Sequence, residues 1–371
     1  MQDYFGKDTP KLGFGMMRLP RKRISIDVEQ TKKMVDLFLE AGFTYFDTAF
    51  VYPGSEEATG KALVSRYPRE SFTLATKLNA GIPGMTEKIA KSEFNTSLKR
   101  TGAGYFDYYL LHNLLESNYK KYEKLRIWEF ADEQKKNGLI KHIGFSFHNG
   151  PELLDRLLTE HPDVDFVQLQ LNYADWESEK VCSRQNYEVA RKHGKSIVIM
   201  EPVKGGKLAD PPEEVKSLFL SYAPQSSFAS WAIRFAASLE GIITVLSGMS
   251  NVQQVEDNIS YMRDFKPLNS EEQKIIREAQ KILGKSVAVP CTSCHYCVDG
   301  CPQSIPIPDV FTALNTHLSN GRTAEARESY EKAVKGSGRA SDCINCRACE
   351  SVCPQHIDIT GFLKQAAGIL E

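Results

Sequence analysis

Two cysteine runs with the same spacing constrain this chain more than any other feature of its sequence. The runs are Cys291, Cys294, Cys297 and Cys301, and Cys343, Cys346, Cys349 and Cys353, and a proline follows each. Eight of the nine cysteines therefore lie in two short segments after residue 290. A secreted protein held by disulfides spreads its cysteines more evenly. The pattern indicates metal binding in a reducing compartment.

The spacing within each run indicates the ligands of an iron–sulfur cluster. Two residues between ligands let one loop wrap three thiolates around a cubane, and the proline ends the loop. The runs resemble those of bacterial two-cluster ferredoxins, in which the fourth cysteine serves the other cluster. This resemblance implies two [4Fe–4S] clusters, one held by Cys291, Cys294, Cys297 and Cys353 and the other by Cys343, Cys346, Cys349 and Cys301. Zinc is the competing metal, but Cys₄ zinc sites rarely carry a third cysteine at the same interval.

Upstream of the cysteines, β-rich runs alternate with segments of helical spacing. We predict eight strands: Lys11–Met16, Thr44–Asp47, Phe72–Lys77, Phe106–His112, Ile140–Ser146, Asp165–Leu171, Ser196–Glu201 and Ile242–Ser247. Strands that alternate with helices predict parallel βαβ units, and eight units predict an α/β protein of the (β/α)₈ or TIM barrel type. The chain has 371 residues, more than the roughly 250 typical of one barrel, so we expect a second, smaller domain.

The boundary between the two domains is predicted near Pro267, which interrupts the alternating pattern. A helix is predicted to begin after a cap at Asn269 or Ser270 and to end at Gly284. We therefore assign residues 1–268 to the barrel and residues 269–371 to a mainly α-helical domain with both cysteine runs. Two further helices, Asp309–Ser319 and Thr323–Val334, are predicted between the runs, as in α-helical two-cluster ferredoxin modules, which this part resembles.

Four polar residues lie at or just after predicted strand ends, where TIM barrels place their active sites: Asp47, Tyr52, Lys77 and His112. Each residue also has a structural interpretation, because an Asp can cap a helix, a Lys can be solvated and a His can be hydrogen bonded in a core. Together, however, they fit carbonyl reduction. The developing alkoxide needs a proton, and a Tyr beside an ammonium group is a better donor at neutral pH than a free Tyr.

The segments around these residues resemble those of the aldo-keto reductase family. They are Phe46-Asp47-Thr48-Ala49, Tyr52 with Gly54-Ser55-Glu56, Ala75-Thr76-Lys77 and Leu110-Leu111-His112, and the similarity spans the whole barrel. The resemblance implies that Tyr52 is the general acid and that Lys77 lowers its pKa. It also implies that Asp47 pairs with Lys77 and that His112 polarises the carbonyl group.

The resemblance also implies which residues bind a nicotinamide nucleotide, either NADPH or NADH. These are Ser146 and Gln168 at the nicotinamide amide, Met200, Lys204 and Gly206 at or after the end of the strand Ser196–Glu201, and Gln254 and Asn258 near the 2′-phosphate position. Met200 stands where the family commonly has a stacking aromatic, and Gln254 where it often has an Arg. These departures leave room for a flavin as the alternative cofactor.

We therefore expect a cytoplasmic, aldo-keto-reductase-like oxidoreductase that acts on a small-molecule carbonyl substrate or its alcohol. The two clusters would allow electron transfer, with an electron-transfer protein as a further partner. The alternative is a redox-responsive nucleotide-binding protein whose clusters sense oxidant or dock a partner. The net charge of −1, with no long run of one sign, argues against a nucleic-acid partner. No apolar stretch approaches the roughly 18 residues that span a bilayer, which argues against a membrane partner.

Overall fold

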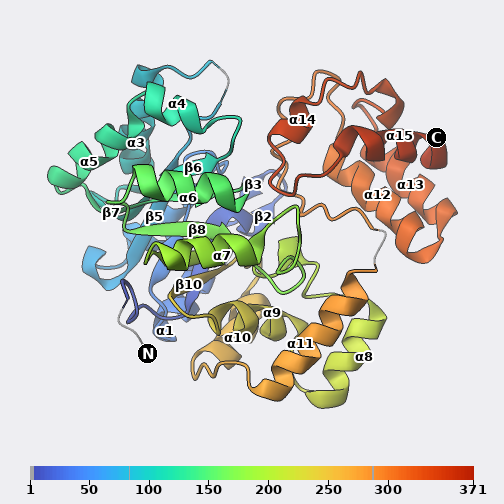
Figure 1. The fold of residues 1–371 in the computed structure, drawn as a ribbon, viewed down its shortest axis with the longest axis horizontal. Coiled ribbons are helices and arrows are strands. Elements are labelled where there is room, and N and C mark those ends of the chain that lie inside the picture. Colours follow the sequence, from blue (N-terminus) through green and yellow to red (C-terminus); the bar gives the residue numbers. More distant parts are fainter. Residues whose placement is uncertain (1–3, 83, 286–287) are drawn as a thin grey trace.

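The protein is described by a computed structural model, in which residues 4–82, 84–285 and 288–371 are placed well enough to describe. A closed barrel and a smaller helical part lie side by side (Figure 1). The barrel strands are β1 (Leu12–Gly15), β4 (Tyr45–Asp47), β5 (Thr73–Leu78), β6 (Phe106–Leu114), β7 (Ile140–Phe147), β8 (Phe166–Gln170), β9 (Ser196–Met200) and β10 (Ile242–Ser247).

All eight barrel strands pair in parallel with their neighbours in the chain, and β10 closes the barrel onto β1. The predicted α/β barrel is thereby confirmed, with each predicted strand in its expected place. The strands are buried on both faces, which explains why they read as nearly continuous apolar runs. A short hairpin of β2 (Arg21–Lys22) and β3 (Ser25–Ile26) lies outside the barrel sheet.

The α-helices that precede the first cysteine run lie with the barrel. They are α1 (Val28–Glu40), α2 (Ser55–Thr59), α3 (Glu87–Thr101), α4 (Tyr119–Lys124), α5 (Ile127–Lys136), α6 (Pro151–Glu160), α7 (Ser183–Lys192), α8 (Glu213–Tyr222), α9 (Phe228–Ala237), α10 (Val252–Met262) and α11 (Ser270–Leu283). Short helical turns are η1 (Met16–Arg18), η2 (Gly60–Val64), η3 (Arg69–Ser71), η4 (Lys204–Gly206) and η5 (Ala340–Asp342).

The smaller part has a core of its own, formed by helices and by the cysteine loops. Its helices are α12 (Ile307–Asn320), α13 (Thr323–Ala333), α14 (Ala348–Ser351) and α15 (Ile359–Leu370). The expected helices between the cysteine runs are thus present as α12 and α13. Phe311 on α12 and Phe362 on α15 pack edge to face, with ring centroids 6.0 Å apart.

Helix α11 packs against the barrel side of the molecule (Figure 1). Its residues Ile275, Ile276 and Ala279 share an apolar cluster with Phe219 of α8 and Trp231 of α9. This packing favours a domain boundary after α11 over the expected boundary between residues 268 and 269. Pro267 interrupts the alternation of strands and helices, but this interruption does not show which part of the protein the next helix packs against. The division into two domains at a given residue stays a prediction.

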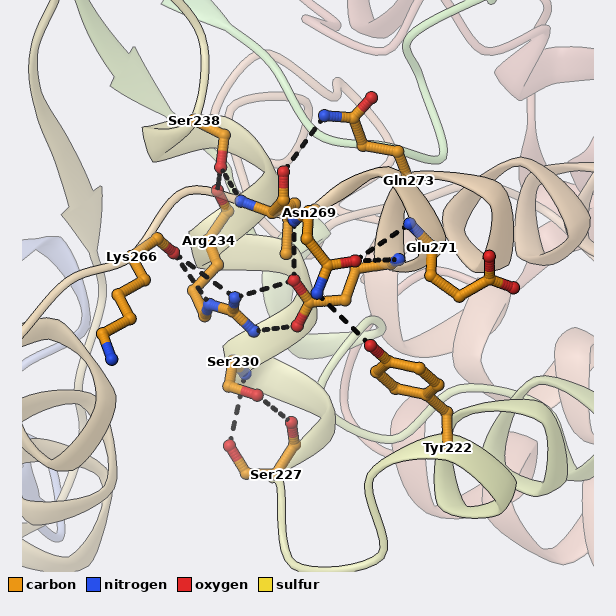
Figure 2. A network of polar contacts seen from close by, with 11 residues as sticks. Tyr222, Ser227, Ser230, Arg234, Ser238, Lys266, Asn269, Glu271 and Gln273 are labelled. Atoms are coloured by element: carbon orange, nitrogen blue, oxygen red, sulfur yellow. Dashed lines mark hydrogen bonds and ion pairs between the residues drawn. The ribbon is translucent and has the colours of Figure 1, made fainter.

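A polar network fixes the start of α11 (Figure 2). The Asn269 side chain accepts the backbone N–H groups of Glu271 and Glu272, both at 2.9 Å, and the Glu272 carboxylate accepts the Asn269 N–H at 2.8 Å. The same carboxylate receives two N–H bonds from Arg234 of α9, at 2.7 and 3.0 Å. The predicted Asn269 cap is therefore present, and it is tied to the barrel.

Candidate active site

A cavity of about 650 Å³ opens at the carboxyl ends of the barrel strands. Its volume lies within the range of roughly 300–1,000 Å³ found for ligand sites. Residues at or near the ends of β1, β4, β6, β8, β9 and β10 contribute to its wall. This is the end of a TIM barrel where active sites lie. Among the four predicted catalytic residues, Asp47, Tyr52 and His112 line the cavity, and Lys77 contacts Asp47 directly.

Asp47 and Lys77 form a buried ion pair at the floor of the cavity. Their side chains are 5% and 1% exposed. The Lys77 ammonium also donates to the Thr48 carbonyl oxygen at 2.8 Å, and Asp47 accepts the Gln168 amide N–H at 3.1 Å. Burial raises the pKa of Asp47 and lowers the pKa of Lys77, while their mutual attraction opposes both shifts. Such a pair is costly to separate, because either partner alone would be an uncompensated buried charge.

The ring of Tyr52 lies over this ion pair. The Lys77 nitrogen is 5.1 Å from the Tyr52 ring centroid. Burial raises the pKa of Tyr52 well above its usual value, and nearby Tyr296 and Asp47 add to the increase. We expected Lys77 to lower this pKa, but its net shift is upward. The reason is that burial of the phenol, the largest cause, and the neighbouring Tyr296 and Asp47 all raise it.

His112 stands beside Tyr52, with ring centroids 5.7 Å apart and ring planes at 83°. Burial lowers the pKa of His112 well below its usual value, and the neighbouring Lys77 charge lowers it further. The imidazole is therefore neutral at physiological pH. Its Nδ1 atom is buried without a hydrogen-bond partner. A neutral imidazole in the cavity wall can donate one N–H bond to an oxygen atom in the cavity.

Five of the seven predicted nucleotide-binding residues line the cavity: Gln168, Met200, Gly206, Gln254 and Asn258. The structure does not bring the other two, Ser146 and Lys204, to the cavity wall. Ser146 Oγ accepts the Asn113 backbone N–H at 2.7 Å, and the Lys204 ammonium is paired with the Asp175 carboxylate. The Lys204 ammonium is thus engaged with a protein carboxylate, while the Ser146 hydroxyl keeps its own O–H as a donor. A single sequence does not reveal such local partners.

The structure brings the eight clustered cysteines together in two sets. Cys291, Cys294, Cys297 and Cys353 line one small cavity, and Cys301, Cys343, Cys346 and Cys349 line another. These are the two groups expected as ligand sets from the ferredoxin resemblance, including the exchange of the fourth cysteine. All nine cysteines are free thiols. Four thiols around a small cavity are the donor set that an iron–sulfur cluster requires.

Sequence reasoning missed several residues of the cavity wall. Tyr296 and Cys294 of the first cysteine loop lie there, as do Arg18, His148 and Glu201. His148 is buried, and burial lowers its pKa to about 3. The sequence carries no signal for Tyr296, because its place at the cavity depends on how the helical part docks on the barrel. Arg18 and Glu201 flank predicted strand ends, which is a signal that could have found them.

Comparison with family models finds two matches in this chain. A model of the aldo/keto reductase family matches residues 11–281. A model of a 4Fe-4S dicluster domain matches residues 290–357. Among the described residues, no helix is both long enough and apolar enough to cross a membrane.

Individual relatives point to the same family. An aldo-keto reductase from Mycolicibacterium smegmatis is 31% identical over 209 residues, which are 56% of this chain and 69% of that protein. The chain spans about half the length of two further curated relatives, 53% and 47%. The holo form of an aldo-keto reductase from Bacillus halodurans superposes with a TM-score of 0.61 at 24% identity, covering 74% of this chain and 95% of that one. A Klebsiella pneumoniae aldo-keto reductase in complex with NADPH gives a TM-score of 0.58 at 19% identity, covering 76% and 96%.

Proposed function

This chain belongs to the aldo/keto reductase family and carries a C-terminal 4Fe-4S dicluster domain, and we propose that it reduces a small carbonyl compound, or oxidises the corresponding alcohol, by hydride transfer with a nicotinamide nucleotide. The observation that carries this proposal is the group at the cavity floor. The buried Asp47–Lys77 pair lies beneath the Tyr52 ring, and neutral His112 stands beside the Tyr52 ring.

Tyr52 is the proton donor in this proposal. Its raised pKa keeps the phenol protonated at neutral pH, so a proton is available when the carbonyl oxygen becomes an alkoxide, which is a stronger base. His112 donates an N–H bond to the same oxygen and polarises the carbonyl group. The ion pair of Asp47 and Lys77 holds the Tyr52 ring in place and balances the local charge. Both ionic side chains are buried, so water is excluded from the floor of the cavity.

The cavity fits a nucleotide both in size and in polar character. Beyond Tyr52 it extends to the start of α10, where Asn251 caps the helix by accepting the Gln254 N–H at 2.9 Å. A helix N-terminus favours a phosphate group. Gln170 Oε1 and Glu201 Oε2 belong to residues of the wall and are buried without protein partners. The nucleotide supplies the hydride when it is bound. NADPH is our first choice, and NADH and a flavin are the alternatives that a binding titration distinguishes.

We further propose that the two cysteine sets hold two [4Fe–4S] clusters. The clusters supply one-electron transfer when they are bound. Cys294 lies in the wall of the cavity, whereas Cys346 of the second set is exposed. This arrangement supports an electron path from an electron-transfer protein at the surface toward the cavity. Cysteines grouped as metal ligands rather than spread as a disulfide framework support a cytoplasmic location, where thiols stay reduced.

The test of the catalytic proposal is the variant Tyr52→Phe. It removes the proton donor but leaves the ring over Lys77, so we expect a loss of carbonyl reduction of at least about 10²-fold. Nucleotide affinity, measured by fluorescence titration, should stay within about twofold because the binding surface is unchanged. Equal turnover numbers in the two proteins would show that Tyr52 is not the acid.

The comparison of Tyr52→Phe with the wild type also distinguishes the proposed enzyme from the alternative, a redox-responsive nucleotide-binding protein. Such a protein would bind the nucleotide without turnover, so both proteins would show no carbonyl reduction. The position of Cys294 in the cavity wall favours this alternative as a second candidate, because a change at the cluster would reach the bound nucleotide. Nucleotide affinity that depends on added oxidant, together with no turnover on a panel of aldehydes and ketones, would support it.

A further inference from the structure

The segment from Val289 to Cys297, which we call the first cysteine loop, reaches into the cavity of the barrel through Cys294 and Tyr296. Its residue Tyr296 lines the cavity. Tyr52 and His112 line the same cavity, and Tyr296 is among the neighbours that raise the pKa of Tyr52. The ring centroid of Tyr296 is 6.4 Å from that of His112, with the ring planes at 83°. Tyr296 is therefore a neighbour of Tyr52 and His112, the two residues that we propose bind the carbonyl oxygen of the substrate.

The barrel holds this loop in place through contacts with its backbone. Arg18 donates to the Thr292 carbonyl oxygen at 2.8 Å, and Lys207 donates to the Val289 carbonyl oxygen at 2.8 Å. Gly205 has a φ of +65°, and a Cβ atom there would lie 2.5 Å from the Thr292 carbonyl oxygen. The approach of the two backbones thus requires a glycine at this position. Tyr296 is presented to the cavity by an anchored loop.

A bound substrate would fill the space that the side chains of Tyr52, His112 and Tyr296 share. Its carbonyl oxygen accepts the Tyr52 hydroxyl, and the rest of the molecule covers the Tyr296 hydroxyl. A hydroxyl group that a ligand covers without pairing it costs free energy. A second oxygen on the substrate removes this cost if it lies within reach of Tyr296.

We propose that Tyr296 makes the enzyme selective for carbonyl compounds with a second oxygen on the adjacent carbon, namely α-hydroxy carbonyls and 1,2-dicarbonyls. In such compounds the second oxygen lies about one hydrogen-bond length from the carbonyl oxygen. It becomes the partner of the Tyr296 hydroxyl while Tyr52 and His112 hold the carbonyl oxygen. The substrate subsite is then shared by the barrel and the cysteine loop. This inference rests on the proposed function, because it assumes that reduction takes place at Tyr52.

Hydroxyacetone and butanone form a matched pair for the test, because they differ only by a hydroxyl group in place of a methyl group. The ratio of their kcat/KM values is measured in the wild type and in Tyr296→Phe, both purified without oxygen and with equal iron content. The intrinsic reactivities of the two ketones cancel when the ratios are compared. We expect the preference for hydroxyacetone to fall about tenfold or more in the variant, because Phe has no hydroxyl group to pair with the second oxygen of the substrate.

A binding measurement gives a second readout that does not depend on turnover. Calorimetric titration of the enzyme loaded with NADP⁺ follows the binding of each ketone where no hydride is available. Hydroxyacetone should bind more weakly to Tyr296→Phe than to the wild type, while the affinity for butanone should stay the same or rise. The affinity for NADP⁺ should be equal in both proteins, since Tyr296 lies at the Tyr52 end of the cavity.

The outcomes separate this inference from the proposed function. An unchanged kcat/KM ratio in Tyr296→Phe overturns the selectivity, and so does an equal loss for both ketones. Full activity in Tyr52→Phe would overturn the proposed function. Reduction that requires Tyr52, together with a ratio that does not depend on Tyr296, would overturn the inference alone.

Discussion

At the scale of single residues, Lys77 shows how the barrel carries a charge in its interior. Its ammonium group is neutralised by Asp47 and also donates to the Thr48 carbonyl oxygen. The same two residues were predicted from the sequence, because they stand at strand ends that converge in a parallel barrel. The sequence did not predict the raised pKa of Tyr52, since this pKa is set by burial of the phenol and by the approach of Tyr296 from a distant part of the chain.

We predict that Lys77→Met lowers the free energy of unfolding by about 3–5 kcal/mol at pH 7, because Asp47 is left as an unpaired buried carboxylate. The pKa of Asp47 is already raised by burial, and it should rise further without Lys77. A carboxyl group whose pKa is raised on folding contributes stability below its unfolded pKa and loses it as pH rises. The difference in the free energy of unfolding between the wild type and the variant should therefore grow as the pH rises above about 4, the pKa of an unfolded Asp.

The control for this prediction is the double variant Asp47→Asn with Lys77→Met. It removes both charges, so it should recover most of the lost stability at pH 7. Urea unfolding of the three proteins at several pH values provides the measurement. A single and a double variant of equal stability would show that the charge of Asp47 is not responsible.

At the scale of secondary structure, the sequence predicted the strands closely and the helices nearly as well. The expected run Phe106–His112 is observed as β6 (Phe106–Leu114), and the expected helix Thr323–Val334 is observed as α13 (Thr323–Ala333). These elements have strong local signals, namely apolar runs, caps and glycine stops. The packing partner of α11 and the place of Tyr296 were not predictable, because both depend on contacts between segments far apart in the chain.

Helix α11 offers a prediction about its N-terminal cap (Figure 2). Asn269→Ala removes the acceptor of two N–H groups at the start of the helix, which costs about 1 kcal/mol. Amide hydrogens in the first turn of α11 should then exchange about fivefold faster, as measured by mass spectrometry. Asn269→Asp keeps an acceptor oxygen and is the matched control. Equal exchange in the Ala and Asp variants would contradict the role of the cap.

At the scale of the whole molecule, two separate cores meet at the mouth of the barrel. The apolar cluster of the helical part is distinct from the clusters of the barrel. Besides the anchored cysteine loop, the His356 ring contacts the His148 carbonyl oxygen at 2.9 Å. These contacts place the first cysteine set at the cavity. The second set faces outward, where Ile344 is 60% exposed. The two sets should therefore differ in how they affect the site.

We predict that protein purified without oxygen carries about eight irons and eight sulfides per chain, because each [4Fe–4S] cluster holds four of each. Cys294→Ser and Cys346→Ser remove one ligand from different sets, so each should lose about half of the iron while circular dichroism still shows a folded barrel. Only Cys294→Ser should also lower the preference for hydroxyacetone over butanone, because Cys294 belongs to the loop that places Tyr296 next to Tyr52. Iron analysis and the two kcat/KM values, measured on the same samples, provide the test. Stoichiometric zinc would overturn the cluster assignment, and equal loss of preference in both variants would show that the effect does not pass through the first loop.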